Sequence, residues 1–409
     1  MKTLEAARAE VLEGIKPLPS EPVSIWEALG RVLADDVVAA SDVPPFPNSA
    51  MDGYAVRGSD VVEPGAVLTL IGEIAAGQAS SQTVGAGQAI KIMTGAPMPE
   101  GADTVVKVED TQAVEEKVSI GPAVAIGTSV RSAGGDVERG ARVFDAGTRL
   151  TPMHVGVLAT IDVAEVMVHR RPRVAFMSTG DELIPPGGGE LGPGMIRDSN
   201  RPMVSSLLRE AGVDTIDLGI IPDDPDALRA ALDEGSSADV IVSTGGVSMG
   251  DYDVTKLVLE GGSEVSFWKV AIQPAKPFAF GRIGDALFFG LPGNPVSVLV
   301  SFEQFLRPAL MRLQGATRIL RPQVSAVAGE AMVTDPEKTV FVRVIIDGEE
   351  DGPPRVISSG GQASNVLSAA ATADAFAVVP RGVGAVEAGQ AVTIELFKSP
   401  ETRAWADGI

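Results

Sequence analysis

The sequence contains no cysteine, and aromatic residues make up only 4% of its 409 residues. The absence of cysteine excludes disulfides, thiolate zinc sites, iron–sulfur clusters and cysteine nucleophiles. Histidine is almost as scarce: His154 and His169 are the only two, and the sequence has no Ser-His-Asp or His-Glu-x-x-His pattern. We therefore expect both histidines to be structural and aliphatic side chains to fill the cores.

Positive charge and long apolar runs are also in short supply. The 33 basic residues face 54 acidic ones, and the resulting net charge of −21 repels phosphate backbones and anionic membranes. No uncharged apolar stretch is long enough to span a bilayer, and the N-terminus MKTLEAARAEVLEGI lacks the apolar core of a signal peptide. We expect a cytoplasmic protein with no nucleic-acid partner and no membrane partner.

What the sequence does contain predicts several domains, because 409 residues exceed a single core. In the first 40 or so residues, apolar side chains recur at helical spacing around Leu4–Leu12 and again at Ile25, Leu29 and Leu33, which predicts two helices. The proline-rich string SDVPPFPN ends this pattern. From Tyr54 to about Val143, short apolar runs separated by Gly, Pro and Asp predict a small β-rich lobe.

Residues 173–313 alternate strand and helix patterns. The apolar strings VAFMST, TIDLGII, DVIVSTGG and LFFGLPG read as strands, and Asp224-Pro225 and Asn294-Pro295 read as helix starts. This alternation predicts a mostly parallel sheet with helices on both faces. From about Arg321 the pattern is all-β. The predicted fold class is therefore multidomain α/β plus β.

Three loops directly follow predicted strands, where an open α/β sheet binds its ligands. They are Ser178, Thr179, Gly180, Asp181 and Glu182; then Ser243, Gly245, Gly246, Ser248, Gly250, Asp251 and Asp253; and finally Pro292, Gly293, Asn294 and Pro295. A glycine-rich turn after one strand is often only a tight connection. Three of them at one sheet edge are much harder to ascribe to coincidence.

The composition of these loops indicates an anion site. Glycines and small hydroxyl residues let backbone N–H groups converge on an anion, and a helix start at Pro295 adds a favourable dipole. An acidic chain needs such a pocket to hold an anion at all. The carboxylates of Asp181, Glu182, Asp251 and Asp253 would repel a phosphate unless a hard cation lay between, and oxygen ligands favour Mg²⁺. The loops therefore predict a phosphate-and-magnesium site.

Other candidate segments are weaker when taken alone. Lys269 and Lys276, on the proline-rich segment 268–277, could supply positive charge or could belong to a solvated surface turn. The segments 47–54, with Asp52, and 92–97, with Thr94, read as polar turns.

Several strings become specific when they are read in order. They are PFPNSAMDGYAVR, IMTGAPMP, STGDEL, RDSN, STGGVSMGDYD, FWKVAIQPAKPFAFG and LPGNPVS. Together they closely resemble the bacterial molybdopterin molybdenumtransferase family, whose eukaryotic relatives include gephyrin. The resemblance runs from the N-terminus to about residue 396.

This resemblance implies an architecture. It implies an elongated N-terminal domain (1–45 and 137–170), a β-rich lobe (46–136), a molybdopterin-binding α/β domain (171–315) and a C-terminal β-barrel-like domain (320–409). It also implies a homodimer whose active cleft lies between the α/β domain of one subunit and the β lobe of the other. That arrangement would explain why loops far apart in sequence look functional.

The resemblance also implies an activity: insertion of molybdate into adenylylated molybdopterin with release of AMP, the final step of molybdenum cofactor biosynthesis. Molybdopterin-AMP and molybdate would be the substrates and Mg²⁺ the cofactor, with molybdopterin adenylyltransferase and apo-molybdoenzymes as protein partners. Positioning and charge neutralisation should dominate the catalysis. The residues that match the family's catalytic positions are Asp52, Thr94, Asp136, Glu182, Asp253, Lys269 and Lys276. We expect Glu182, Asp251 and Asp253 to bind the metal, and the glycine and serine loops to bind the pterin phosphates.

The chain departs from the family pattern at a few positions. Gly135 stands where a glutamate is common, Gln273 where a lysine is frequent, and Ala275 where a glycine is frequent. Loss of the lysine could weaken oxyanion binding or shift specificity, so a tungstate-inserting relative stays an alternative. So does a non-catalytic molybdopterin-binding scaffold, although the chain has no long linker. A pyrophosphatase or adenylyltransferase of the same α/β superfamily is a further alternative, which the MDGYA lobe and the C-terminal β module argue against.

Overall fold

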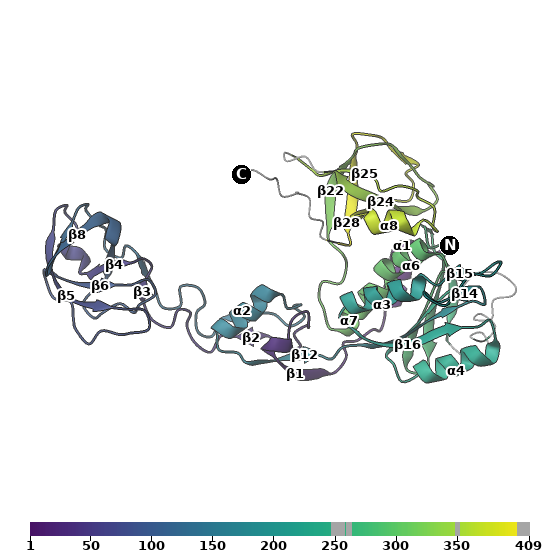
Figure 1. Ribbon diagram of the computed structural model, residues 1–409, viewed down its shortest axis with the longest axis horizontal. Helices are drawn as coiled ribbons and strands as arrows, with labels where there is room; N and C mark the ends of the chain where they lie inside the picture. The colour runs from purple at the N-terminus through teal and green to yellow at the C-terminus, as the bar shows by residue number, and fades with distance from the viewer. Residues whose placement is uncertain (247–257, 259–263, 348–351, 399–409) are drawn as a thin grey trace.

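The computed structural model describes residues 1–246, 258, 264–347 and 352–398. The molecule is elongated (Figure 1): a β lobe lies at one end, a small middle unit follows, and an α/β unit with a C-terminal β unit forms the other end. None of the helices in these ranges is long and apolar enough to cross a membrane.

The first predicted helix is confirmed and the second is wrong. Helix α1 (Leu4–Leu12) packs its apolar face into the core of the α/β unit, most of whose residues lie more than 150 positions further along the chain. Strand β1 (Ser20–Ser24) and a 3₁₀ turn, η1 (Ile25–Glu27), replace the second helix. The reason is long-range pairing: β1 runs antiparallel to β12 (Glu165–His169), and Ile25 and Leu33 pack into the core beneath this pair. Their helical spacing is therefore incidental.

The middle unit is built from segments on both sides of the lobe in sequence. Strands β2 and β11 pair antiparallel, and helix α2 covers the unit's core. The bounds are β2 Val37–Val38, β11 Arg142–Phe144 and α2 Pro152–Thr160.

The lobe is a six-stranded sheet with the order β7-β4-β6-β5-β9-β8. Alternate residues of β4 enter two different cores, because Tyr54 and Val56 face one side and Ala55 the other. The predicted β-rich lobe is thus present. Its strands are β4 Gly53–Val56, β5 Val67–Ile74, β6 Gln88–Ile92, β7 Thr104–Lys107, β8 Thr111–Val114 and β9 Lys117–Ile120, with β3 Asn48–Ser49 paired to β10 Val130–Arg131 beside them.

The α/β unit has a six-stranded sheet with the order β16-β13-β17-β21-β20-β18. The first four strands are parallel, and β20 runs antiparallel to both of its neighbours, β21 and β18, so the sheet is mixed. The strands are β13 Arg173–Thr179, β16 Asp214–Ile221, β17 Val240–Thr244, β18 Ser266–Lys269, β20 Pro277–Ile283 and β21 Ala286–Leu291.

Helices cover both faces of this sheet, as the strand and helix alternation predicts. Phe176 of β13 joins the core beneath α1, α3, α6 and α7, whereas Ala175 and Met177 join the core beneath α4. Asp224 caps α4 as predicted, accepting bonds from the N–H groups of Asp226 and Ala227. The helices are α3 Asn200–Glu210, α4 Pro225–Gly235, α6 Pro295–Ser301 and α7 Arg307–Leu313, the last two joined by a π-helical turn over Phe302–Leu306.

The C-terminal unit is a closed, barrel-like sheet. Its strands follow the order β24-β25-β22-β28-β26, and β26 pairs back onto β24. A short strand of the α/β unit, β19 (Ile272–Gln273), adds parallel to β24 and ties the two units together. The remaining bounds are β22 Gln323–Ala328, β23 Met332–Val333, β24 Thr339–Asp347, β25 Arg355–Ser358, α8 Leu367–Thr372, β26 Ala375–Val379, β27 Ala385–Val386 and β28 Ala391–Leu396.

Candidate active site

A cavity of about 800 Å³ opens at the carboxyl ends of β13, β17 and β21. The register explains its position, because Ser178 lies beside Thr244 and Thr244 beside Leu291 at the ends of three parallel strands. The loops that follow these strands must therefore meet at one edge. The predicted site residues in the lining are Thr179, Gly180, Glu182, Gly245, Gly246, Pro292, Gly293, Asn294 and Pro295.

Two glycines of these loops are required by their backbone conformation and, at Gly245, also by a close approach to the backbone of the first loop. Gly245 has a φ of +91°, and a Cβ atom there would lie 2.7 Å from the carbonyl oxygen of Thr179. Gly180 has a φ of +143°, and a Cβ atom there would overlap the Glu182 carboxylate. Only glycine tolerates both conditions, so the first two loops can lie against each other.

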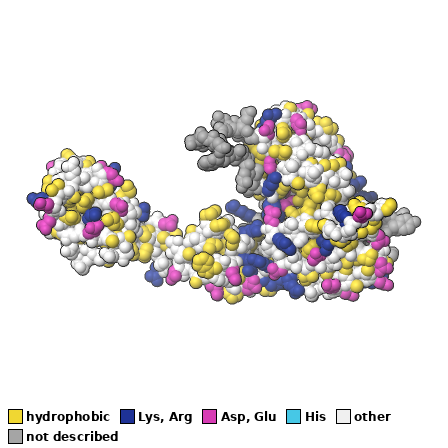
Figure 2. Space-filling view, viewed as in Figure 1, with side chains coloured by type: hydrophobic (Ala, Val, Ile, Leu, Met, Phe, Trp, Pro, Cys, Tyr) yellow, Lys and Arg dark blue, Asp and Glu magenta, His cyan; other side chains and the backbone are white. Residues whose placement is uncertain are grey.

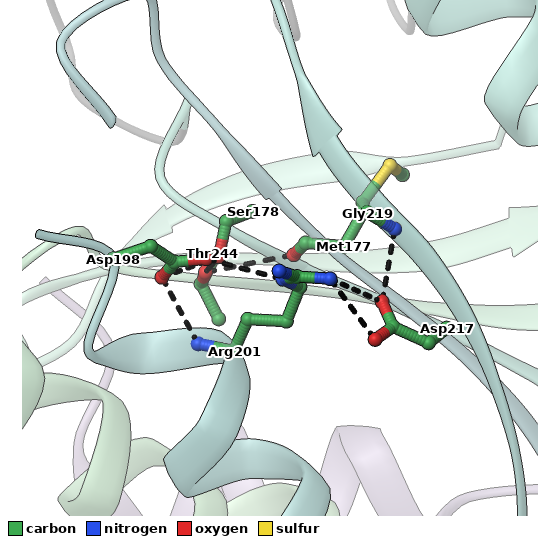
Figure 3. Close-up of polar contacts among 7 residues, drawn as sticks. All are labelled: Met177, Ser178, Asp198, Arg201, Asp217, Gly219 and Thr244. Atoms are coloured by element: carbon green, nitrogen blue, oxygen red, sulfur yellow. Dashed lines mark hydrogen bonds and ion pairs between the residues drawn. The ribbon is translucent and has the colours of Figure 1, made fainter. Parts of the chain in front are cut away.

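The floor beneath the cavity is a closed polar network (Figure 3). The Ser178 hydroxyl donates to Asp198 Oδ1 at 3.1 Å and lies 2.9 Å from the Thr244 hydroxyl. All three residues are buried, and Asp198 is only 1% exposed. Ser178 was predicted to bind substrate, but its hydroxyl is engaged here and it is not part of the cavity lining. Ser243 is also buried outside the lining.

Arg201 neutralises the buried carboxylate of this floor. Its backbone N–H and its Nε donate to the two oxygens of Asp198 at 3.1 and 3.2 Å, while its Nη1 contacts both oxygens of Asp217 at 3.0 Å (Figure 3). Arg201 thereby links the start of helix α3 to strand β16. The floor is a rigid support on which the loops rest.

Sequence reasoning assigned no role to the segment 197–200, although it quoted the string RDSN. The structure places Arg197, Asp198, Ser199 and Asn200 in the cavity lining. The Asn200 side chain donates to the Gly293 carbonyl at 2.7 Å, and its own Oδ1 is buried with no partner among the described residues. Asn200 therefore fixes the third loop against α3. A run of four polar residues that leads into an amphipathic helix was the sequence signal by which this segment could have been identified.

The carboxylates at the cavity mouth come from two loops. Glu182 and Asp223 both line the cavity and are exposed. Asp181 and Asp223 are joined, since Asp181 Oδ1 accepts from the Asp223 N–H at 3.0 Å. Within the described residues, no three acidic or histidine side chains form a metal-binding group. Ser248, Gly250, Asp251 and Asp253 lie outside the described residues.

The basic loop lies beside the cavity. Lys269 ends β18 opposite Pro277, which lines the cavity, and the Val270 N–H donates to the Lys276 carbonyl at 2.8 Å. Both lysine side chains are exposed, and neither is part of the cavity lining.

A buried cation that sequence reasoning missed lies in the C-terminal unit. Arg343 of β24 is 0% exposed, and its Nη2 donates to the carbonyls of Gly361 and Ala363 at 2.7 and 3.2 Å. Its Nε and Nη1 have no hydrogen-bond partner among the described residues, and burial lowers its pKa. The loop it holds continues to Asn365, which lines the cavity. In the sequence, Arg343 is hidden inside the apolar strand VFVRVII.

Three further predicted residues lie far from the cavity, in the lobe or in its connection to the middle unit. In the lobe, the N–H and hydroxyl of Thr94 each donate to Asp52 Oδ1 at 2.7 Å, and this contact lowers the pKa of Asp52, the backbone N–H more than the hydroxyl. Asp136 is exposed in the connection between lobe and middle unit, with its N–H bonded to the Val43 carbonyl. The lobe lies at the far end of the molecule from the α/β unit (Figure 1). A single chain does not bring these residues to the cavity.

Comparison with known proteins decides the family. Residues 2–161 match the family model "MoeA N-terminal region (domain I and II)", residues 175–312 "Probable molybdopterin binding domain", and residues 325–397 "MoeA C-terminal region (domain IV)". The molybdopterin molybdenumtransferase of Haemophilus influenzae is 39% identical over 401 residues, which cover 97% of this chain and 99% of that protein. The chain belongs to the molybdopterin molybdenumtransferase family.

Other members of the molybdenumtransferase family agree with this assignment. The Bacillus subtilis molybdopterin molybdenumtransferase is 36% identical, with 94% of this chain and 92% of that protein covered. A solved molybdopterin biosynthesis moeA protein from Pyrococcus horikoshii OT3 superposes with a TM-score of 0.84 at 29% identity, covering 97% of this chain and 100% of that chain. The resemblance read from the ordered strings is therefore confirmed, and so is the fold class.

The structure shows where this chain differs from the common sequence pattern of the molybdenumtransferase family. Gln273 ends the short strand β19, which pairs with β24 of the C-terminal unit. Ala275 is buried with a φ of +80°, a left-handed conformation that favours glycine, so the glycine common in the family has a backbone reason. Gly135 lies next to Asp136 in the exposed connection to the lobe.

Asp198 and Asp217 both pair with Arg201 in the floor of the cavity, but we expect them to contribute unequally to the free energy of unfolding. We expect Asp198→Asn to lower the free energy of unfolding by about 3 kcal/mol, because three donors converge on this buried carboxylate and the amide of the variant would place an N–H against one of them. Asp217→Asn is the control, since Asp217 is about half exposed, and it should cost less than about 1 kcal/mol. Urea unfolding followed by circular dichroism measures both. Equal losses would show that the floor does not depend on Asp198.

Proposed function

We propose that this protein inserts molybdate into adenylylated molybdopterin and releases AMP. The observation that carries the proposal is the meeting of three strand-end loops around one cavity in a chain whose relatives are named molybdopterin molybdenumtransferase. The volume of about 800 Å³ suits a pterin joined to a nucleotide. Its substrate would come from a molybdopterin adenylyltransferase, and its product would go to apo-molybdoenzymes.

The role of the loops follows from the chemistry of the substrate. An adenylylated pterin carries a phosphoanhydride, whose charge a chain of net charge −21 repels at long range. The N–H groups of Gly180 and Gly245 already donate to the carbonyls of Ile221 and Leu291. The N–H groups of Gly246 and Gly293, in the cavity lining, are therefore the proposed donors, which carry no counter-charge and need no side-chain reorganisation. The Asp198–Arg201 floor and the Asn200 bond to Gly293 keep these loops in register. Held in this way, the phosphoanhydride, whose P–O bond breaks as AMP leaves, would keep a fixed position relative to molybdate.

The residues at the cavity mouth fit a divalent cation. Glu182 and Asp223 supply exposed carboxylate oxygens, and Mg²⁺ commonly binds through one or two carboxylates together with substrate phosphates. Asp251 and Asp253 are further proposed donors beyond the described residues. When bound, the ion would neutralise charge on the phosphoanhydride as it breaks.

Molybdate would be attracted by the cations beside the cavity. Lys269 and Lys276 are exposed next to Pro277, and Arg343 lies behind the loop that contributes Asn365. Arg343 has no carboxylate partner among the described residues; it is buried outside the cavity lining, so its positive charge would act on an oxyanion only at a distance, through the loop. Gln273 removes one cation that relatives often have, which keeps tungstate as a possible alternative substrate.

We propose further that the working site is shared between two subunits. Asp52 and Thr94 form a rigid pair in the lobe, far from the cavity of their own chain (Figure 1). The middle unit carries exposed apolar side chains, among them Trp26 at 89%, Met153 at 73% and Leu29 at 57%. Exposed apolar groups of this size are typical of a protein–protein contact. A two-fold contact here would let each lobe reach the partner's cavity.

One assay separates this function from its alternatives. Purified protein receives adenylylated molybdopterin and Mg²⁺, with or without molybdate, and AMP release and reconstitution of an apo-molybdoenzyme are followed. We expect molybdate-dependent AMP release together with reconstitution. Absence of AMP would indicate a scaffold, and AMP release that ignores molybdate would indicate a hydrolase. Parallel reactions with tungstate give the metal preference.

A further inference from the structure

A second pocket lies where the middle unit meets the α/β unit, and its lining is unusually basic. It has a volume of about 390 Å³ and is lined by four arginines, Arg31, Arg149, Arg171 and Arg209, against one acidic residue, Glu210. Figure 2 shows Lys and Arg side chains gathered at this junction. In a chain with 54 acidic and 33 basic residues, such a concentration of positive charge creates a local potential that attracts anions.

Arg149 provides the inner wall of this pocket. Its guanidinium donates to the backbone carbonyls of Gly30 and Glu210 at 3.2 and 3.5 Å, and no carboxylate of the described residues pairs with it. Gly30 and Gly212 lie against it, since a Cβ atom at either would come within 3.9 Å of its Nη2. The guanidinium is therefore fixed in place by backbone groups, without a counter-ion.

A second layer of arginines behind Arg149 adds to the positive charge. Arg307 and Arg321 share the buried carboxylate of Glu303, which lies 2.9 Å from Arg321 and 3.9 Å from Arg307. Burial, and next the charge of Arg321, lowers the pKa of Arg307 to about 10. Burial and the charge of Arg321 also lower the pKa of Arg149. Glu210, the one acidic residue of the pocket lining, lies 3.6 Å from Arg321 of this second layer and forms no ion pair with Arg149 among the described residues.

Of the other three arginines of the lining, Arg31 is buried and pairs with Glu21 at 2.6 Å. Arg171 and Arg209 are exposed and form no ion pair among the described residues. Arg171 belongs to the connection that enters the α/β sheet, and Arg209 to the last turn of α3. An anion between them would contact both units at once.

We propose that this pocket, which no step of the proposed reaction uses, binds a phosphate dianion, either free or as the phosphate of a nucleotide. Guanidinium groups bind tetrahedral oxyanions through paired N–H donors, and the pocket is large enough for a nucleotide. Because its walls come from two units, the bound phosphate ties the middle unit to the α/β unit.

The test compares two double variants that change the net charge equally. Arg171→Gln with Arg209→Gln removes the outer cations, and Arg229→Gln with Arg355→Gln removes two exposed arginines elsewhere. Inorganic phosphate and AMP are titrated separately into the full chain by calorimetry at fixed ionic strength. We expect saturable phosphate binding that weakens about tenfold or more in the pocket variant and stays within about twofold in the control. Whichever of inorganic phosphate and AMP loses more affinity in the pocket variant is the ligand that the pocket binds.

Three results would overturn the proposal. One is the absence of saturable binding of either ligand. Another is equal weakening in both double variants, which would mean that only net charge matters. The third is unchanged binding in the pocket variant, which would place the bound anion elsewhere, for instance in the sheet-edge cavity. Thermal unfolding with and without phosphate gives a second readout, because a ligand that bridges two units raises the midpoint of the wild type and not that of the pocket variant.

Discussion

A Gly245→Ala variant is expected to lose at least about a hundredfold in AMP release, because a shift of about 1 Å in positioning groups costs that much. The added methyl group would lie 2.7 Å from the Thr179 carbonyl oxygen and 2.9 Å from the Thr179 hydroxyl. Since these atoms end strand β13, the second loop must move away from the first. The left-handed φ of +91° adds backbone strain, and together we expect a loss of about 2–4 kcal/mol in unfolding free energy.

Gly187→Ala is the matched control for backbone strain. Gly187 also has a positive φ, +80°, but a Cβ atom there would meet nothing within 4 Å. It should cost only about 1–2 kcal/mol and leave AMP release nearly unchanged. Activity and urea unfolding of both variants are measured side by side. Full activity in Gly245→Ala would mean that the close approach of the first two loops is not needed for the reaction.

An Asp52→Ala variant is expected to lose about a hundredfold or more in AMP release while the chain stays folded. Asp52 is exposed, and its carboxylate accepts both the N–H and the hydroxyl of Thr94. Those bonds lower the pKa of Asp52, so the group is ionised at neutral pH. Removal of the carboxylate frees the Thr94 loop and takes a negative charge from the surface proposed to face the partner's cavity.

Asp60→Ala is the control in the same lobe. Asp60 also accepts a loop N–H, that of Gly87 at 2.9 Å, but it belongs to no predicted site segment. Steady-state AMP release should be unaffected in this variant, and circular dichroism should be native for both. Equal loss of activity in the two variants would reduce the role of Asp52 to general stability of the lobe.

The convergence of the three loops could be predicted because it follows from strand order. Parallel strands end at the same sheet edge, so Thr179, Thr244 and Pro292 had to be neighbours once the strands were recognised. The cap at Asp224 was predictable for a similar reason, since its chemistry is local. Both inferences need only short-range pattern and the rules of sheet geometry.

The parts that could not be predicted depend on long-range contacts. The spacing of Ile25, Leu29 and Leu33 mimicked a helix because pairing of β1 with β12, more than 140 residues away, buries Ile25 and Leu33. Arg343 looked like an interruption in an apolar strand, whereas its environment is made by the loop 361–363. Asn200 lies at a helix start, and its bond to Gly293 is visible only when the chain is folded.

Asp52 is the clearest example of a residue whose sequence segment resembles the cavity loops but which lies far from the cavity in the folded chain. MDGYA and TGDEL are both turns beside strands, yet they belong to units at opposite ends of the molecule (Figure 1). No periodicity or composition contains that information. The resemblance to the family supplied the idea of a second subunit, which remains a proposal.

The most direct measurement mixes two inactive chains. Asp52→Ala protein and Glu182→Ala protein are unfolded and refolded together, mixed dimers are verified by native mass spectrometry, and AMP release is measured against each variant alone. If every site takes its lobe from one chain and its cavity from the other, random pairing restores about a quarter of wild-type activity. Mixed dimers that stay as inactive as their parents would contradict the shared site.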